Sequence, residues 1–464
     1  MKRRRSPERP KDGPPAQMTR PNSVTTNYAY DNLSRLTSVL HQLSGSTIDG
    51  ASYTLDSAGN RTAKTDQLAA VTSNYTYDAI YQLTQVTQAN NTTESYSYDA
   101  VGNRTASLGV SSYTTNASNE LTTTSNATYT YDSNGNTLTK TVGSNTTSYT
   151  WDFENRLTSV TLPGSGGTVT FKYDPLGRRI YKSSTAGTSV FAYDGDNVIE
   201  ETNSSGGAVA RYSETQAIDE PLAELRSSTT SYYEADGLGS ISSLTNAAGA
   251  VANTYTYDSF GKQTSSSGSL TNPFQYTARE FDIESGLYYV RARYLDSSTG
   301  RFLGEDPVKF YAGINFYTYA LNSPTYWIDP SGFNVTVKLF PGNQPGGHIG
   351  LGVNTDDTVG FYPNHDTLYS PGHIQRDDQW QEGHPVDCII IITTPQQDID
   401  IQRYIDIRKK KPGWWRPGRD CSNFVHDAFQ AGGIQLDDST FPRSLFGSLE
   451  KLPHTSCSNV TPLL

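Results

Sequence analysis

The stretch GRDCSNFVHDAFQAGG, residues 418–433, has the pattern of a short amphipathic helix with a thiol in its first turn. Asp420 is a suitable N-cap, and the apolar residues fall on one helix face: Cys421, Phe424, Val425 and Ala428. A thiol in the first turn faces the positive end of the helix dipole, which favours the nucleophilic thiolate. Free cysteines are also among the most buried residue types, so a core role is the alternative. The helix pattern alone leaves both interpretations open.

A nucleophilic thiolate needs a base, and His348 is the candidate for that role. It starts a predicted strand in GGHIGLGV, residues 346–353, after a glycine-rich entry. Because side chains alternate along a strand, His348 and Gly350 share one face, and the glycine leaves space beside the imidazole. A surface or capping histidine would show the same local pattern, so the pairing of Cys421 with His348 is a hypothesis for geometry to test.

Groups suited to nucleophilic and acid–base chemistry are concentrated in the last third of the chain. The three cysteines follow residue 387 and six of the seven histidines follow residue 347. The number and spacing of the cysteines indicate neither a disulfide framework nor a zinc site, and we expect no cofactor and no metal. A third group should orient the histidine. The candidates are Asn354, His365 and Asp366, none of which stands out, and His365 is taken as the orienting residue.

These groups lie in a predicted α+β domain, residues 334–464, where the composition changes sharply. Four segments are predicted as strands: 334–342, 346–354, 358–364 and 387–395. The last of them, DCIIIITTP, is a continuous apolar run typical of a buried strand. Helical spacing of apolar residues predicts a helix over 395–411, followed by a loop and the helix that carries Cys421.

A repeat, Tyr-x-Tyr-Asp, fills most of the preceding chain. It occurs at five places, Tyr28–Asp31, Tyr75–Asp78, Tyr96–Asp99, Tyr129–Asp132 and Tyr255–Asp258, and looser copies end at Asp56, Asp152, Asp174 and Asp194. Tyr-x-Tyr places two rings on one face of a strand, and Asp followed by Gly predicts a turn. Each unit is therefore a predicted β-hairpin, and its rings are buried only if neighbouring units stack.

Chain length, net charge and the N-terminal sequence limit the classes of protein to which this chain can belong. A chain of 464 residues should form two or three domains. The net charge of −11 does not indicate a nucleic-acid-binding surface. The basic, proline-rich residues 1–24 are expected to be a disordered tail. No apolar segment follows them as in a signal peptide, and no apolar run is long enough to span a membrane.

The repeats resemble the YD repeats of RHS (rearrangement hotspot) and teneurin-like proteins over residues 25–333. The array covers residues 25–232, and residues 233–333 resemble the RHS core-associated domain, with NPFQYTAREFDIESGLYYVRARYLDSSTGRFLGEDP and NFYTYALNSPTYWIDPSGF. The resemblance implies a hollow β-shell that encloses a C-terminal effector, usually a toxin. It also implies an immunity protein, export machinery, and secretion or cell-surface delivery without an N-terminal signal peptide. The chain holds fewer repeats than a full-length member of that family.

The segment IDPSGF, residues 328–333, is similar to the motif after which RHS cores cut themselves. The resemblance implies an aspartyl autoprotease formed by Asp306 and Asp329, with cleavage after Phe333. That chemistry needs two neighbouring carboxyl groups, one ionised to activate water and one protonated to assist the carbonyl. The alternative is that both Asp-Pro pairs are ordinary turns.

The order of a histidine strand before a cysteine helix resembles the circularly permuted papain-like fold of lecithin:retinol acyltransferase-like proteins. This implies a cysteine hydrolase of peptidase, amidase or acyltransferase type, acting on a protein, peptidoglycan or lipid acyl group and not on nucleic acid. We therefore expect a mostly β fold, a YD-repeat hairpin array followed by a small α+β domain. The rival prediction is a non-enzymatic β-repeat surface or adhesion protein with a C-terminal binding domain.

Overall fold

The computed structural model describes residues 17–33, 35–215, 218–307 and 315–329 in full, and seven strands between residues 334 and 456 by their backbone. The predicted helices over 395–411 and 420–433 lie outside the described residues, as does the tail before residue 17. The chain divides into two units. One is the shell, with residues up to 304 and residues 317–330, and the other contains residues 305–316 and the chain from residue 331 on. Each unit is described by itself.

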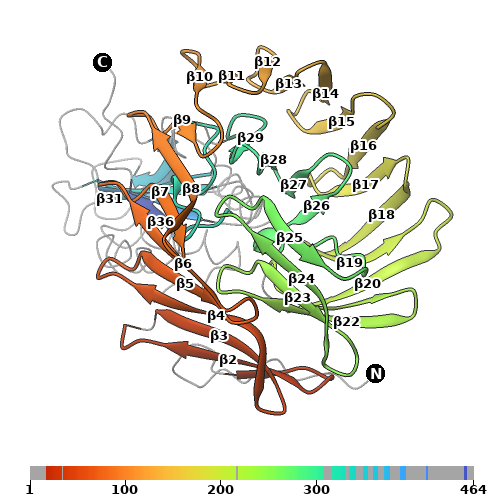
Figure 1. Ribbon diagram of the computed structural model, residues 1–464. Helices are drawn as coiled ribbons and strands as arrows, with labels where there is room; N and C mark the ends of the chain where they lie inside the picture. Colours follow the sequence, from red (N-terminus) through yellow and green to blue (C-terminus); the bar gives the residue numbers. More distant parts are fainter. Residues whose placement is uncertain are drawn as a thin grey trace. The chain divides into compact units, whose positions relative to one another are not determined.

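The wall of the shell consists of two antiparallel sheets in which every strand pairs with its neighbours in sequence (Figure 1). The nine strands of the first are β1 (Gln17–Thr19), β2 (Val24–Tyr30), β3 (Leu36–Leu43), β4 (Ser46–Leu55), β5 (Arg61–Asp66), β6 (Val71–Tyr77), β7 (Leu83–Gln88), β8 (Asn91–Tyr98) and β9 (Arg104–Ser107).

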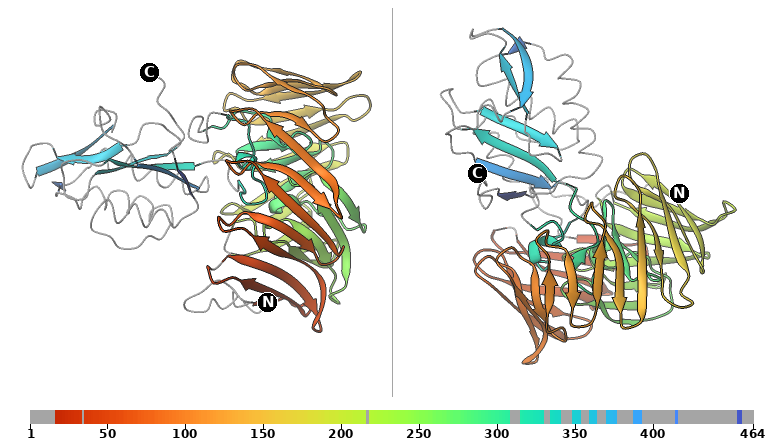
Figure 2. Two further views of the ribbon diagram at one scale, coloured as in Figure 1. Left: turned by 60° about the vertical axis from the view of Figure 1, so that its left-hand side comes forward. Right: turned by 90° about the horizontal axis from the view of Figure 1, so that it is seen from above.

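The second sheet continues the same up-and-down order, and an isolated bridge pairs Ser107 of β9 with Val110 in the segment between the two sheets. Its sixteen strands are β10 (Tyr113–Thr115), β11 (Leu121–Thr124), β12 (Thr128–Tyr131), β13 (Thr137–Val142), β14 (Asn145–Trp151), β15 (Leu157–Thr161), β16 (Thr168–Tyr173), β17 (Arg179–Ser184), β18 (Gly187–Asp194), β19 (Asn197–Thr202), β20 (Ala208–Glu214), β21 (Pro221–Arg226), β22 (Thr229–Ala235), β23 (Ile241–Thr245), β24 (Val251–Tyr257) and β25 (Gln263–Ser267). Figure 2 shows the strands of this wall from two further sides.

The aspartate of each repeat builds the turn that reverses the chain. At Asp99 the backbone N–H donates to the Asn103 carbonyl at 2.9 Å. The Asp99 carboxylate accepts the N–H groups of Val101 and Asn103 at 3.0 and 2.8 Å. Gly102 has a φ of +80°, a conformation that glycine adopts without steric cost. The recurring Asp, Gly and Asn are thus the residues that this turn requires, and the predicted hairpins are confirmed.

In several repeats the second tyrosine joins the hairpin to the previous one. Its hydroxyl donates to a backbone carbonyl in the previous returning strand: Tyr77 to Arg61 at 2.5 Å, Tyr173 to Leu157 at 2.6 Å, and Tyr257 to Ile241 at 2.9 Å. In the looser copy YTWD, the indole N–H of Trp151 donates to the Thr137 carbonyl at 2.8 Å. The ring itself is apolar, while its hydroxyl or N–H group donates to a backbone carbonyl that the pairing of the strands leaves without a partner.

A plug, residues 274–304 and 317–329, covers the aromatic inner face of the wall. It contains β26 (Glu280–Asp282), β27 (Leu287–Val290), β28 (Arg293–Asp296), β29 (Arg301–Phe302) and the short 3₁₀ turns η1 (Tyr276–Ala278) and η3 (Ala320–Asn322). Figure 1 shows β26–β29 within the curve of the two sheets. Buried Tyr288, Phe302 and Tyr319 pack against β7 and β8, while Tyr289 and Tyr294 pack against β14–β16. One continuous wall is therefore covered by a segment far along the chain.

A buried ionic cluster fixes the plug to β17. The Arg179 guanidinium lies 2.5 Å from Asp282 and 2.6 Å from Glu280, and only 1% of the arginine and of Asp282 is exposed. The same guanidinium lies 4.4 Å from the ring centroid of Tyr289. Burial opposes its charge, but the carboxylates of Asp282 and Glu280 keep the pKa of Arg179 well above its ordinary value. The charge is therefore maintained by the plug itself.

The second unit contains a seven-stranded sheet of order β35-β33-β32-β31-β30-β34-β36. The strands are β30 (Asn334–Phe340), β31 (His348–Val353), β32 (Val359–Pro363), β33 (Ser370–Arg376), β34 (Asp387–Ile392), β35 (Trp414–Trp415) and β36 (His454–Ser456). The four strands predicted from sequence correspond to β30, β31, β32 and β34. The segment SPGHIQR of β33 was not predicted as a strand because proline and glycine disfavour that structure.

Replacing Arg179 by methionine should destabilise the shell, because two carboxylates would stay buried without their main cation. We expect the free energy of unfolding to fall by about 3–5 kcal/mol, measured by urea denaturation of the full chain. The matched control is Arg211→Met, whose ion pair with Glu200 is 64% exposed on the arginine side, with a cost below about 1 kcal/mol. Equal losses in the two variants would contradict the anchoring role of Arg179.

Candidate functional site

The structure describes only part of the predicted cysteine site. Cys421, His365 and the alternatives Asn354 and Asp366 lie outside the described residues, as does Phe333. His348 is the first residue of β31 and pairs in register with Phe340 of β30. Cys388 lies on the other neighbour of β30, opposite Lys338. The histidine thus opens a strand near the middle of the sheet, and its pairing with Cys421 stays a prediction.

At the end of the plug, Asp329 is held by an arginine. Its Oδ2 lies 2.7 Å from Nη2 of Arg293, whose side chain is 6% exposed. The guanidinium carbon is 3.6 Å from the ring centroid of Phe302. Stacking on one side and a carboxylate on the other leave the arginine few alternative positions. Asp329 is therefore a fixed carboxylate and not only the first residue of an Asp-Pro turn.

Asp306, the other predicted aspartate, is also buried, with 2% of its surface exposed. Its backbone N–H donates to the carbonyl of Phe316 at 2.9 Å. This residue belongs to the unit that contains the C-terminal strands, whereas Asp329 belongs to the shell. The two predicted aspartates thus belong to different units, and the autoprotease pair stays a prediction.

Arg293 was missed from sequence. All four residues of β28, Arg293–Asp296, are buried, and long charged side chains are seldom fully buried unless they are paired. The signal in the sequence was an arginine at the start of the short segment RYLD, next to a tyrosine and a leucine. A search for charges within predicted core strands would have found it.

A cavity of about 280 Å³ lies in the shell between β5–β8 and β22–β25. It is lined by ionisable and hydroxyl side chains: Arg61, Lys64, Tyr75, Glu94, Asp236, Ser240, Ser242, Tyr255, Asp258 and Tyr276. The Lys64 ammonium lies 2.6 Å from Asp236. Burial raises the pKa of Asp236, but the Lys64 charge outweighs it and the pKa is lowered. This carboxylate is ionised at neutral pH.

Two further carboxyl groups of the cavity behave in the opposite way. Burial, and next the charge of Glu94, raise the pKa of Asp258 to about 7. Burial also raises the pKa of Glu94, against hydrogen bonds from Tyr96 and Ser259. Like charges in a shared site disfavour double ionisation. Asp258 is therefore a group in the cavity that can exchange a proton near neutral pH, and the pKa of its neighbour Glu94 is raised as well.

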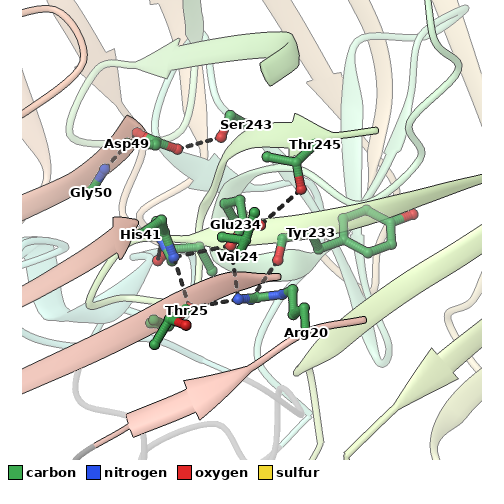
Figure 3. A network of polar contacts seen from close by, with 12 residues as sticks. Arg20, Val24, Thr25, His41, Asp49, Gly50, Tyr233, Glu234, Ser243 and Thr245 are labelled. Carbon is green, nitrogen blue, oxygen red and sulfur yellow. Dashed lines mark hydrogen bonds and ion pairs between the residues drawn. The ribbon is translucent and has the colours of Figure 1, made fainter. Parts of the chain in front are cut away.

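A polar network closes the wall beside this cavity, where β2–β4 meet β22 and β23 (Figure 3). Arg20 Nη1 and His41 Nδ1 lie 2.9 and 3.0 Å from the same oxygen of Glu234, and all three side chains are buried. His41 Nε2 lies 3.0 Å from the Ala235 carbonyl. Because a carbonyl oxygen only accepts, Nε2 carries a hydrogen. These contacts join segments roughly 200 residues apart in the sequence.

No helix in the described part of the chain combines the length and the apolar character that a membrane crossing requires.

Known relatives share the shell. A protein of Bacillus spizizenii described as the tRNA3(Ser)-specific nuclease WapA is 32% identical over 330 residues, which is 65% of this chain and 12% of that protein. The toxin protein Tse5 of Pseudomonas aeruginosa is 40% identical over 67 residues, 14% of this chain and 5% of its own length. The chain thus spans a small part of these relatives.

Among solved structures, the crystal structure of TcdB2-TccC3-Cdc42 matches with a TM-score of 0.58 at 20% identity, over 68% of this chain and 18% of that one. At this identity the likeness shows the fold alone. The sequence profile of the teneurin YD-shell matches residues 24–325, more than half of the chain. Those residues comprise the Tyr-x-Tyr-Asp hairpins and nearly all of the plug, and the chain belongs to the teneurin YD-shell family.

Proposed function

We propose that this chain is a toxin-type effector protein in which the YD-repeat shell carries a C-terminal effector domain. The observation that carries the proposal is that the shell and its plug are followed by a separate sheet with its own strand order, built without Tyr-x-Tyr-Asp hairpins. The names of the relatives Tse5 and WapA, a toxin and a nuclease, support the role of a carrier. Delivery outside the producing cell, export machinery and an immunity protein belong to the same proposal.

The junction between shell and effector is proposed to cut itself. Asp329, positioned by Arg293, takes a proton from water, whose oxygen attacks the carbonyl carbon of Phe333. Asp306 in its protonated form donates a hydrogen bond to that carbonyl. The bond from Phe333 to Asn334 breaks, and the proton passes to the new amino group. Burial of Asp306 and the ion pair of Asp329 support different roles for the two carboxyl groups.

The released domain is proposed to be a cysteine hydrolase. The Cys421 thiolate attacks an acyl carbon, and His348 first accepts the thiol proton and then gives it to the leaving group. The backbone N–H of Cys421 stabilises the oxyanion. Water then hydrolyses the acyl-enzyme, or another acceptor takes the acyl group. The order of strands β30–β32 and the place of His348 at the start of β31 support this assignment.

A nuclease is the second candidate, because WapA is described as a tRNA-specific nuclease. The acidic net charge of −11 argues against it, since nucleic-acid-binding surfaces are usually basic. The two activities act on different targets. They are distinguished by the molecule that is damaged when the chain is expressed.

The purified chain should break into two fragments, the second of which begins at Asn334. Asp306→Asn or Asp329→Asn should slow the cut by a factor of about 100 or more, because each removes one acid–base group. Mass spectrometry of the fragments measures the site and the rate. Asp152→Asn is the control, since asparagine occupies the same turn position at Asn203. An intact wild-type chain, or equal cutting in Asp306→Asn, would contradict the proposal.

Alkylation of the three thiols should show Cys421 as the fastest, because only an activated thiol is a thiolate at neutral pH. His348→Ala should slow its alkylation by about tenfold or more, and Cys388 and Cys457 should react at unchanged rates. Mass spectrometry of peptides from chains treated with iodoacetamide measures each rate. A slow Cys421, or a fast one that ignores His348, would refute the pairing and favour a binding domain.

Expression of the full chain in the bacterial cytoplasm and periplasm tests the activity itself. Cys421→Ser should abolish growth inhibition, while the matched Cys388→Ser should retain it. Inhibition by both forms alike, accompanied by fragmented tRNA, would replace the hydrolase by the nuclease.

A further inference from the structure

The wall of the shell closes at a seam where β2–β8 meet β22–β25, and polar contacts join its two edges. At most of these contacts a carboxylate meets a cation or a hydroxyl group. Asp236 pairs with Lys64, and Asp49 accepts from Ser242 and Ser243 at 2.6 and 2.5 Å. Glu94 of β8 differs, because a second carboxyl group, Asp258, lies opposite it in the turn between β24 and β25.

Glu94, Asp258 and Ser259 are here called the latch. The Ser259 N–H lies 3.1 Å from both carboxylate oxygens of Glu94. The hydroxyl of Tyr96 donates to Glu94 at 2.7 Å. Next in the turn, Phe260 is 1% exposed, and its ring centroid is 5.0 Å from that of Tyr96. The latch is therefore a close contact between the two edges of the seam, beside the cavity that Glu94, Asp258 and Ser259 help to line.

The turn at Asp258 lacks a charge partner that related turns have. Asp258 Oδ1 accepts the N–H groups of Phe260 and Lys262, as the other turn aspartates do. In three of those turns the second carboxylate oxygen pairs with an arginine four residues on, at Arg35, Arg156 and Arg178. Lys262 takes that position here, and among the described residues no ion pair joins its side chain to Asp258.

We propose that the latch is a pH-sensitive switch in the shell wall, which holds the seam shut while one of Glu94 and Asp258 carries a proton and loosens it when both are ionised. The cation that faces both carboxylates is Arg104, 5% exposed and stacked 4.4 Å from the ring centroids of Tyr96 and Phe260. One ionised carboxylate balances Arg104. Two leave an uncompensated negative charge at a partly buried site.

The other titratable groups around the latch keep one charge state across the relevant range. Burial raises the pKa of Tyr75 on β6 to about 12. It also raises the pKa values of Tyr96, of Tyr276 in η1 and of Tyr288 on β27. Lys64 and Asp236 neutralise each other within the same cavity. The titration near neutral pH therefore belongs to Asp258, beside a Glu94 whose pKa is also raised by burial.

The sign of the pH dependence follows from Asp258. Its pKa is about 7 in the closed latch and about 3.9 once the carboxyl group reaches water. The closed form binds the proton more tightly, so the stabilisation is complete below about pH 4 and lost as the pH rises through about 7. Opening should thus become more favourable by roughly tenfold to a hundredfold between pH 5 and pH 8.

The chain itself supplies a well-matched variant. Asparagine occupies the turn position of Asp258 at three other hairpins, Asn116, Asn203 and Asn246, and accepts the same two backbone N–H groups there. Asp258→Asn should therefore keep the turn and remove the titration. Asp236→Asn is the control, because it changes the same kind of turn in the same cavity but removes a carboxylate that is paired with Lys64.

Amide hydrogen exchange of the full chain at pH 5 and pH 8, corrected for the intrinsic rates and read by mass spectrometry, tests the switch. In the wild type, exchange in β8 and β24–β25 should rise at pH 8 by at least about tenfold, while β14–β16 change little. Asp258→Asn and Glu94→Gln should lose this response, and Asp236→Asn should keep it. Lys262→Arg, which supplies the pairing found in related turns, should also weaken it.

An unchanged response in Asp258→Asn overturns the proposal, as does a rise of equal size in β14–β16. Loss of the response in Asp236→Asn to the same extent would assign it to the cavity as a whole and refute the latch. If Asp258→Asn fails to fold, the Glu94→Gln and Lys262→Arg pair decides the question by the same readout.

Discussion

A hairpin with aromatic rings on one face must have that face covered, and this constraint governs the shell. The wall alone is a row of such hairpins, many of them joined to the previous one by a hydroxyl or indole hydrogen bond. The plug supplies the cover, and Arg179 fixes it by pairing with Asp282 and Glu280 in the dry interior. An ion pair buried this deeply contributes mainly to specificity, since hydrophobic contacts of equal volume would supply comparable stability. The ion pair favours one position of the plug against the wall.

The hairpins were predictable because their information is local. The turn uses an Asp or Asn, then a residue with positive φ three positions on, most often Gly, and the two rings alternate with one outward residue. The contacts that close the wall were not predictable, because Arg20 and Glu234 are far apart in sequence and no periodicity marks them. The same holds for Arg293, which is recognised as a partner of Asp329 only once β28 is seen to be buried.

For the candidate sites, the sequence identified the reactive residue types but not their burial or their charged neighbours. It identified Asp306 and Asp329 by motif, while the structure adds that the first is buried and the second is paired. It identified Asp258 as the turn residue of a repeat and did not single out Asp236, although both accept the same two backbone N–H groups. Their electrostatics differ, because one faces a lysine and the other a glutamate across the seam. The repeat unit is similar along the chain, so its turn aspartates acquire different electrostatic surroundings only where the two edges of the wall meet.

The tyrosine bonds between hairpins have a mechanical consequence. Because every strand of the wall pairs with its sequence neighbours, a pull on one end of the chain loads the hydrogen bonds of one strand pair at a time and peels them in order. Each hairpin would give way at a modest force, marked by the loss of one hydroxyl bond. The plug is tied to many strands at once, so it would resist until several hairpins had gone. The shell therefore resists weakly when strands are peeled from one end of the chain, and strongly when the plug is pulled out of the wall.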